Sequence, residues 1–179
     1  MINIEEFEKL KPNFDNNTYE LEPFENFYLS YKKYLPNFPK CVLEQWTHRH
    51  FNGFCYDYWW IEFDRLVFEK VKFTNKMIMQ IGTHMLSTLD NWGDDFINNP
   101  NFRIKKTWLG GYMYENKTFP KPIIVFDVEN SIDFGGKKDL YKPFHLLEGH
   151  MRLAYMRALI RYNVDNIPEI HDIWLSKRI

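Results

Sequence analysis

The chain has 179 residues, of which 45% are hydrophobic and 26% charged, as is usual for one globular domain with its own core. Its net charge of -1 argues against a protein that coats nucleic acid through overall charge, and two cysteines argue against a disulfide scaffold. The sequence shows no signal-like N-terminal segment and no apolar run long enough to span a bilayer. We therefore expect a cytoplasmic protein with no membrane partner.

Charged residues are distributed unevenly along the chain. Residues 1–100 contain ten Lys and Arg against fifteen Asp and Glu, whereas residues 101–179 contain thirteen against nine. The basic excess of the second half agrees with an anionic ligand there. The aromatic share of 18% is high, and these side chains can either fill a core or form a partner surface. Core filling is the simpler interpretation.

Residues 1–100 are expected to be mainly helical. Helical turns are expected at residues 4–10, and apolar side chains at helical spacing predict helices at 22–34 and 40–51. The segment 56–73 fits either a strand or a helix. Thr74 is a good N-cap for one long helix that continues to about residue 98.

The second half reads as alternating strands and turns around one helix. A short strand at 102–108 and a turn at Gly110-Gly111 come first. We then expect a buried strand at 121–127, a polar loop, a strand at 144–147, a helix from about 150 to 162 and a last strand near 169–174. The sequence thus predicts one α+β domain over residues 1–179, in which a helical N-terminal half packs on a small mixed sheet from residues 102–179.

The candidate site is the segment Glu148-Gly149-His150-Met151-Arg152, where a buried strand meets a helix at a glycine. A helix N-terminus presents backbone N–H groups and a partial positive charge, and glycine lets an anion approach the backbone closely. Gly149, His150, Met151 and Arg152 are therefore the expected phosphate-binding residues, with Arg152 as a guanidinium clamp. His150 and Glu148 are the candidate catalytic residues.

Simpler interpretations stand beside these. Gly149 can be an ordinary strand-to-helix turn, His150 a surface histidine, and Glu148 only a charge partner of Arg152. On a helical wheel Arg157 and Arg161 lie near His150 and form a secondary basic stripe, which can equally be a solvated helix face.

The segments Pro122-Ile123-Ile124-Val125, Leu146 to Ala158 and Asn166-Ile167-Pro168 resemble the ParB/sulfiredoxin superfamily. In that superfamily a "Pro-Ile-x-Val" strand precedes a strand that ends in Gly-x-x-Arg and a helix. Partition ParB proteins bind CTP, sulfiredoxins bind ATP and use a cysteine in the turn, and some relatives are described as nucleases or nucleotide hydrolases. His150-Met151 stands where sulfiredoxins have their cysteine, and no helix-turn-helix module follows. The resemblance therefore implies a stand-alone ParB-like domain of bacterial, phage or plasmid type, with a strand–turn–helix unit in its sheet.

The function that this resemblance implies is binding of a nucleotide, such as ATP or CTP with Mg²⁺, or of a DNA phosphate at the turn. Hydrolysis of a phosphodiester or a nucleoside triphosphate is the expected reaction, and the sequence leaves open whether the chain is an enzyme. We expect Arg152→Ala to abolish nucleotide binding without unfolding the protein. No protein-held metal is predicted, because the spacing of His48 and His50 near the two cysteines fits no zinc pattern.

A non-catalytic interaction protein, of inhibitor or immunity type, is the alternative. The acidic, aromatic residues 1–100 would then face a basic protein partner.

Overall fold

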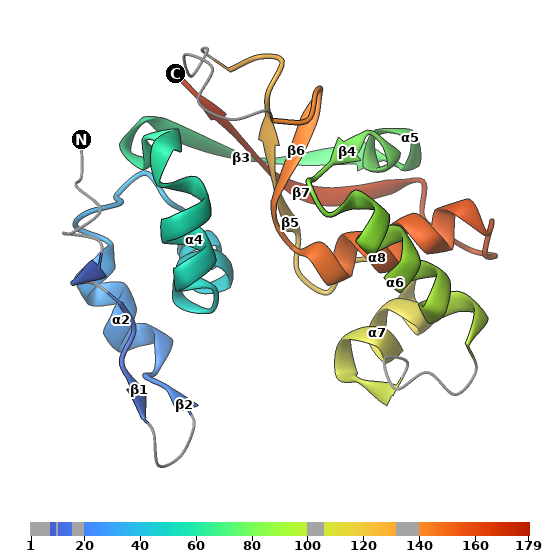
Figure 1. Cartoon of the computed structure of the whole chain (residues 1–179), viewed down its shortest axis with the longest axis horizontal. Helices are drawn as coiled ribbons and strands as arrows, with labels where there is room; N and C mark the ends of the chain where they lie inside the picture. Colours follow the sequence, from blue (N-terminus) through green and yellow to red (C-terminus); the bar gives the residue numbers. More distant parts are fainter. Residues whose placement is uncertain (1–7, 10, 16–19, 100–105, 132–139) are drawn as a thin grey trace. The chain divides into compact units, whose positions relative to one another are not determined.

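A computed structural model of the chain describes residues 8–9, 11–15, 20–99, 106–131 and 140–179 (Figure 1). The fold is α+β, as expected, with a five-stranded mixed sheet and a separate two-stranded one. The chain divides into two compact units. The first comprises Met1–Phe68, Ser131–Lys138 and Ser176–Ile179, and the second Glu69–Asn130 and Asp139–Leu175.

The first unit is built mainly of short helices. A small antiparallel pair, β1 (Phe14–Asp15) and β2 (Glu20–Leu21), precedes α2 (Phe24–Tyr31), whose N-cap is Pro23. The helix predicted at 40–51 is divided between α3 (Lys40–Val42) and a π-helical segment (Leu43–His48), and α4 (Phe51–Tyr58) follows. The turns expected at residues 4–10 lie almost entirely outside the described residues.

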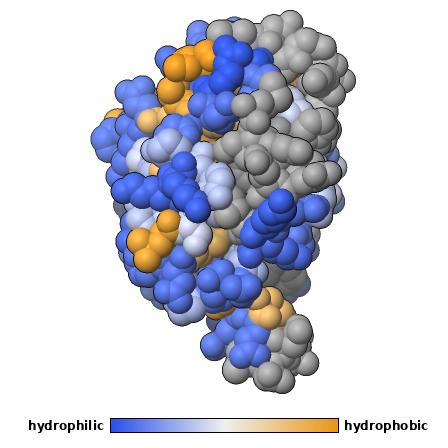
Figure 2. Space-filling model, turned by 90° about the vertical axis from the view of Figure 1, so that its left-hand side faces the viewer, coloured by the Kyte–Doolittle hydropathy of each residue, from blue (hydrophilic) through white to orange (hydrophobic). Residues whose placement is uncertain are grey.

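Aromatic side chains form the core of the first unit. Phe54 stacks on Phe63 with ring centroids 4.1 Å apart, and Trp46 packs edge-on against Phe54 at 4.9 Å. The interpretation of the aromatic residues as core is therefore confirmed for the eight that this unit buries: Phe27, Tyr31, Phe38, Trp46, Phe51, Phe54, Trp60 and Phe63. On the face in Figure 2 the described residues are mainly hydrophilic, and the hydrophobic ones form small separate groups. The eight buried aromatic side chains are thus not part of an aromatic partner surface.

The five-stranded sheet has the order β3-β7-β5-β6-β4 (Figure 1). β5 and β6 are antiparallel, with Phe126 opposite His145, whereas β4 and β6 are parallel, with Gly82 opposite His145. The bounds of the strands are β3 (Leu66–Thr74), β4 (Ile81–Gly82), β5 (Ile123–Asp127), β6 (Phe144–Glu148) and β7 (Ile170–Arg178).

β3 comes from the segment at 56–73, which was left open between a strand and a helix, and β4 comes from residues that were expected to be helical. Thr74 does cap a helix, since its hydroxyl accepts from the Met77 N–H, but α5 (Asn75–Met79) is short. β4 then interrupts the chain before α6 (Leu86–Asn98), so the single helix predicted from Thr74 to about residue 98 is wrong. Gly82 is the physical reason, because glycine is a poor helix former and this backbone must let another residue approach closely.

The glycine pair at 110–111 was also read wrongly. Both glycines lie inside α7 (Trp108–Asn116), because the Thr107 hydroxyl accepts from the Gly110 N–H at 3.1 Å and starts the helix there. The strand predicted at 102–108 lies outside the described residues over 102–105, and its end, Trp108, is helical.

The helix α8 (His150–Arg161) organises the core of the second unit, and α5, α6 and α7 all contact it. Gly93 of α6 allows the closest approach, because a Cβ there would lie 2.5 Å from the carbonyl oxygen of Ala154. Phe96 stacks on Tyr155 at 4.3 Å. Beneath these helices lie apolar side chains from the sheet: Phe73, Ile123, Val125, Leu146 and Ile173.

Candidate functional site

Gly149 connects β6 to α8 in a conformation that other residues rarely adopt. Its φ of 107° lies in the left-handed region, and a Cβ at this position would meet Ile123 Cγ2 at 2.5 Å. The first bond of the helix is donated by Leu153 N–H to the Gly149 carbonyl at 2.8 Å. No side chain caps this helix, because its N-cap is glycine. The backbone N–H groups of a first helical turn are in general the ones that an α-helix leaves without intrahelical acceptors.

Arg152 turns inward from this first helical turn and is only 9% exposed. Its Nη1 donates to the carbonyl oxygen of Lys121 at 2.7 Å and to that of Pro122 at 3.2 Å. Its Nη2 donates to a carboxylate oxygen of Glu148, whose side chain is also largely buried. The guanidinium thus joins the end of β6, the start of α8 and the segment leading into β5. In this structure Arg152 and Glu148 hold the shape of the turn.

His150 is the first residue of α8 and is partly exposed, whereas Met151 packs against the hydrophobic core. The structure therefore brings Glu148, Gly149 and Arg152 together around the segment before β5. His150 and Met151 are partly exposed, whereas Gly149 and Arg152 are buried. A phosphate held here would be held mainly by backbone amides.

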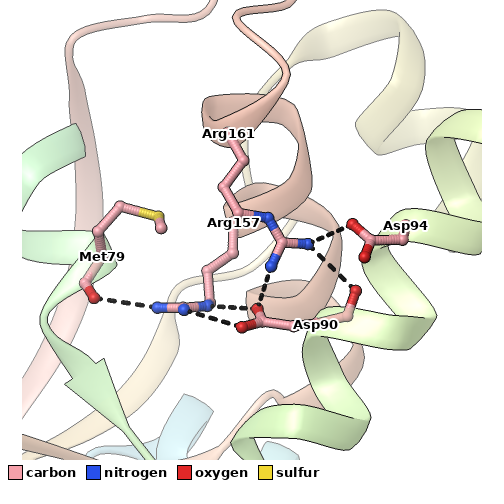
Figure 3. A network of polar contacts seen from close by, with 5 residues as sticks. All are labelled: Met79, Asp90, Asp94, Arg157 and Arg161. Carbon is pink, nitrogen blue, oxygen red and sulfur yellow. Dashed lines mark hydrogen bonds and ion pairs between the residues drawn. The ribbon is translucent and has the colours of Figure 1, made fainter.

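Arg157 and Arg161 do not form a bare basic stripe (Figure 3). Arg157 is buried, and its Nε and Nη2 donate to the two carboxylate oxygens of Asp90 at 2.9 and 3.2 Å. Its Nη1 donates to the carbonyl oxygen of Met79 at 3.0 Å. Arg161 pairs with Asp90 at 2.7 Å and with Asp94 at 2.6 Å. Four charged side chains thus join α6 to α8 and offset one another.

A cluster of rings that the sequence did not predict as a unit lies beside β4 and β6. His145 of β6 is fully buried, and the Tyr141 N–H donates to its Nδ1 at 3.3 Å. The ring centroid of His84 lies 5.4 Å from that of His145 and 5.4 Å from that of Tyr141. Burial, together with the smaller effect of the charges of His84 and His150, lowers the pKa of His145 to about 3. His145 is therefore neutral at physiological pH.

Gly82 is the residue that makes room for this cluster. A Cβ at Gly82 would lie 2.4 Å from the Cβ of Tyr141 and 2.7 Å from its Cγ, so the tyrosine rests directly on the backbone of β4. Tyr141 remains 41% exposed, and His84 is exposed in the loop between β4 and α6. His84 was missed because it fell inside a predicted continuous helix. The signal that could have revealed His84 was Gly82-Thr83, because a glycine at this point argues against a continuous helix.

His48 and His50, for which no zinc site was predicted, lie in different surroundings, because His48 is buried and His50 is exposed. His48 is buried against Phe24 and Phe27, and its Nε2 lies 2.8 Å from the Glu22 carbonyl oxygen. Within the described part of the chain, no group of three or more His, Cys, Asp or Glu side chains is placed to hold a metal ion. No helix there is both long and apolar enough to cross a bilayer.

Comparison of the chain with models of known protein families, with curated proteins and with solved structures finds no match.

Proposed function

We propose that this chain binds a nucleotide or a nucleic-acid phosphate at the first turn of α8. The observation that supports this most directly is the N-terminus of α8, where Gly149 takes the place of a capping side chain. Backbone N–H groups and the helix dipole favour an anion at such a position. The resemblance of the surrounding segments to the ParB/sulfiredoxin superfamily supports the same ligand class.

The side chains divide into two roles in this proposal. Arg152 and Glu148 fix the turn through their pairing and through the carbonyl oxygens of Lys121 and Pro122. His150 contacts the ligand and donates a hydrogen bond to a phosphate oxygen. If the bound ligand is hydrolysed, water attacks phosphorus and the P–O bond to the leaving group breaks. His150 is then the proton-transfer group, since Glu148 is engaged by Arg152.

The substitution His150→Glu tests the site by placing a carboxylate in the first turn of α8. A carboxylate in the first turn of a helix is favourable to the helix itself, by about 0.3–1 kcal/mol. The same carboxylate repels a phosphate. We therefore expect unchanged or slightly higher thermal stability together with loss of ligand binding.

His50→Glu is the matched control. His50 is exposed in the first unit and also stands at the start of a helix, where its carbonyl accepts from Phe54 N–H at 2.9 Å. Each variant and the wild type are measured by thermal unfolding with ATP, CTP, GTP and an oligodeoxynucleotide, with and without Mg²⁺. A ligand at about 100 times its Kd adds roughly 2.7 kcal/mol to the free energy of unfolding.

A shift in the wild type and in His50→Glu, but not in His150→Glu, supports the site. An equal shift in all three proteins places the ligand elsewhere. No shift with any of these ligands overturns the proposed function. Several of the aromatic side chains that suggested the interaction-protein alternative are buried in the core, which leaves fewer of them for a partner surface.

A further inference from the structure

The strand β3 forms a long open edge of the five-stranded sheet. The sheet has the order β3-β7-β5-β6-β4, so its two edges are β3 and β4. β4 has only two residues, whereas β3 has nine. Among the residues that the structure describes, no backbone hydrogen bond joins the outer side of β3 to another segment. Such an edge offers its N–H and C=O groups to an extended segment that reaches it.

Two hydrogen bonds that flank the pair of β3 and β7 show its register. At one end the Asn75 N–H donates to the Glu169 carbonyl oxygen, and at the other the Ile179 N–H donates to the Arg65 carbonyl oxygen, both at 3.2 Å. The start of each strand thus meets the end of the other, so the strands are antiparallel. Residues of an antiparallel pair alternate between bonding to the neighbouring strand and pointing these groups away from it. The odd-numbered residues of β3 therefore bond to β7, and the even-numbered ones turn their N–H and C=O groups to the open edge.

Two of these even-numbered residues are lysines. Lys70 and Lys72 lie on one face of β3, and it is the face away from the helices, because Val71 and Phe73 on the other face pack in the hydrophobic core. Both lysines are exposed, and both pair with Asp172 of β7, at 2.8 and 2.9 Å. One carboxylate thus serves two ammonium groups, and a positive charge remains along the edge.

A second copy of the chain does not fit this edge. Two β3 strands related by a two-fold axis pair antiparallel, and residues equally far from the axis lie opposite each other. With the axis at Lys70 or at Lys72, that lysine meets its own copy, and with the axis at Val71 the two lysines meet each other. With the axis at Glu69, two glutamates meet. Like charges directly opposite destabilise a pair of strands.

We propose that the β3 edge binds an extended acidic segment of a partner protein as an additional strand of the sheet. Acidic residues at every second position of the added strand lie opposite Lys70 and Lys72, and the residue between them lies opposite Val71. Cross-strand pairs of opposite charge stabilise a sheet, and main-chain bonds to the outward groups of β3 supply further affinity. This surface is separate from the phosphate site, and its role does not depend on that proposal.

The first test compares peptides of opposite charge. The probe is a capped synthetic peptide in which glutamate and valine alternate, and the reference peptide has lysine in place of glutamate. Dissociation constants are measured by fluorescence anisotropy at low salt, where exposed charges are screened least. The test protein is the double variant Lys70→Gln with Lys72→Gln. The matched control is Lys76→Gln with Lys106→Gln, which removes the same charge from exposed lysines of the same unit outside β3.

The second test addresses the main-chain bonds. In an antiparallel added strand, the glutamates opposite Lys70 and Lys72 bond to the edge through their own N–H groups, whereas the valine N–H groups point away from it. N-methylation of the glutamate nitrogens therefore removes the bonds to β3, and N-methylation of the valine nitrogens leaves them in place. In a parallel added strand the two sets of nitrogens exchange roles, so the two methylated peptides differ in either case.

We expect the wild type and the control variant to bind the acidic peptide more tightly than the lysine peptide. The variant Lys70→Gln with Lys72→Gln should bind the acidic peptide about two- to thirtyfold more weakly, as expected for two cross-strand charge pairs. One methylated peptide should lose binding and the other retain it. Thermal unfolding followed by circular dichroism verifies that both variants are folded.

Three outcomes overturn the proposal. In one, the wild type binds the acidic peptide no better than the lysine peptide. In another, the two double variants bind the acidic peptide equally well. In either case the lysines only protect the edge from pairing with other strands. In the third, the two methylated peptides bind equally, which shows charge attraction without the addition of a strand.

Discussion

Removal of the Asp90 carboxylate should destabilise the protein far more than removal of the neighbouring Asp94 carboxylate. Asp90 accepts from Arg157 at 2.9 and 3.2 Å and pairs with Arg161 at 2.7 Å. The Arg157 side chain is only 7% exposed. Asp90→Ala therefore leaves a buried guanidinium without its carboxylate, a change that costs about 3–5 kcal/mol in proteins.

Asp94→Ala is the internal control, because Asp94 pairs with Arg161 on the same two helices but its side chain is 45% exposed. Exposed pairs contribute about 0.2–1 kcal/mol. For a chain of this size each kcal/mol corresponds to about 2–4 °C in the unfolding midpoint. Asp90→Ala should then lower the midpoint by about 6–20 °C and Asp94→Ala by about 4 °C or less.

A double variant separates charge imbalance from lost packing. Replacing both members of a buried pair by apolar residues is often neutral, whereas replacing one is costly. The double variant Asp90→Ala with Arg157→Met should therefore be more stable than Asp90→Ala alone. Circular dichroism in urea and on heating measures all of these variants. Equal losses for Asp90→Ala and Asp94→Ala, or a double variant less stable than the single one, would refute the reasoning.

Two further predictions concern the turn and the ring cluster. Gly149→Ala should destabilise the protein by more than about 1 kcal/mol, since the φ of Gly149 is 107° and a Cβ there would meet Ile123. Gly53→Ala inside α4 has room for the added methyl group and should stabilise the protein by about 0.5–1 kcal/mol. Thermal unfolding measures both changes, and a change in the same direction for the two variants would contradict this account. The lowered pKa of His145 means that the unfolded chain binds its proton more readily, so its contribution to stability is fully present above about pH 6.5 and is lost as the pH falls toward 3. The free energy of unfolding, measured in urea at several pH values, should change with pH more steeply in the wild type than in His145→Gln, by about 1.4 kcal/mol per pH unit between about pH 6 and 5. The same dependence on pH in both proteins would show that His145 does not titrate in this way.

The parts of the fold that the sequence predicted correctly are those set by neighbouring residues. The strand at 123–127, the strand that ends before Gly149, and the helix from His150 are all local patterns of apolar runs, a glycine and helical spacing. The strand near 169–174 was found for the same reason, although it extends to Arg178. Thr74 was recognised as an N-cap, and that assignment is confirmed.

The errors arose where a distant residue decides the local structure. Gly82 ends a helical pattern because Tyr141, far along the chain, occupies the space above it. Arg157 and Arg161 looked like a free basic stripe until α6 and α8 are placed against each other, where they pair with Asp90 and Asp94. The pattern of a single sequence does not show such partners, because each of these residues fits its own helix equally well without them.

Arg152 is the site residue for which the local sequence pattern and the contacts with distant residues lead to different roles. From the sequence it was a phosphate clamp whose loss would leave the fold intact. In the structure its guanidinium bonds two backbone carbonyls and the Glu148 carboxylate, which is only 12% exposed. Arg152→Ala would remove the guanidinium that faces this largely buried carboxylate, at a cost of about 3–5 kcal/mol. Loss of binding in this variant would follow from a damaged turn as readily as from a lost contact. The surface position His150, which changes the charge that the ligand meets without altering these buried bonds, is therefore the decisive one to substitute.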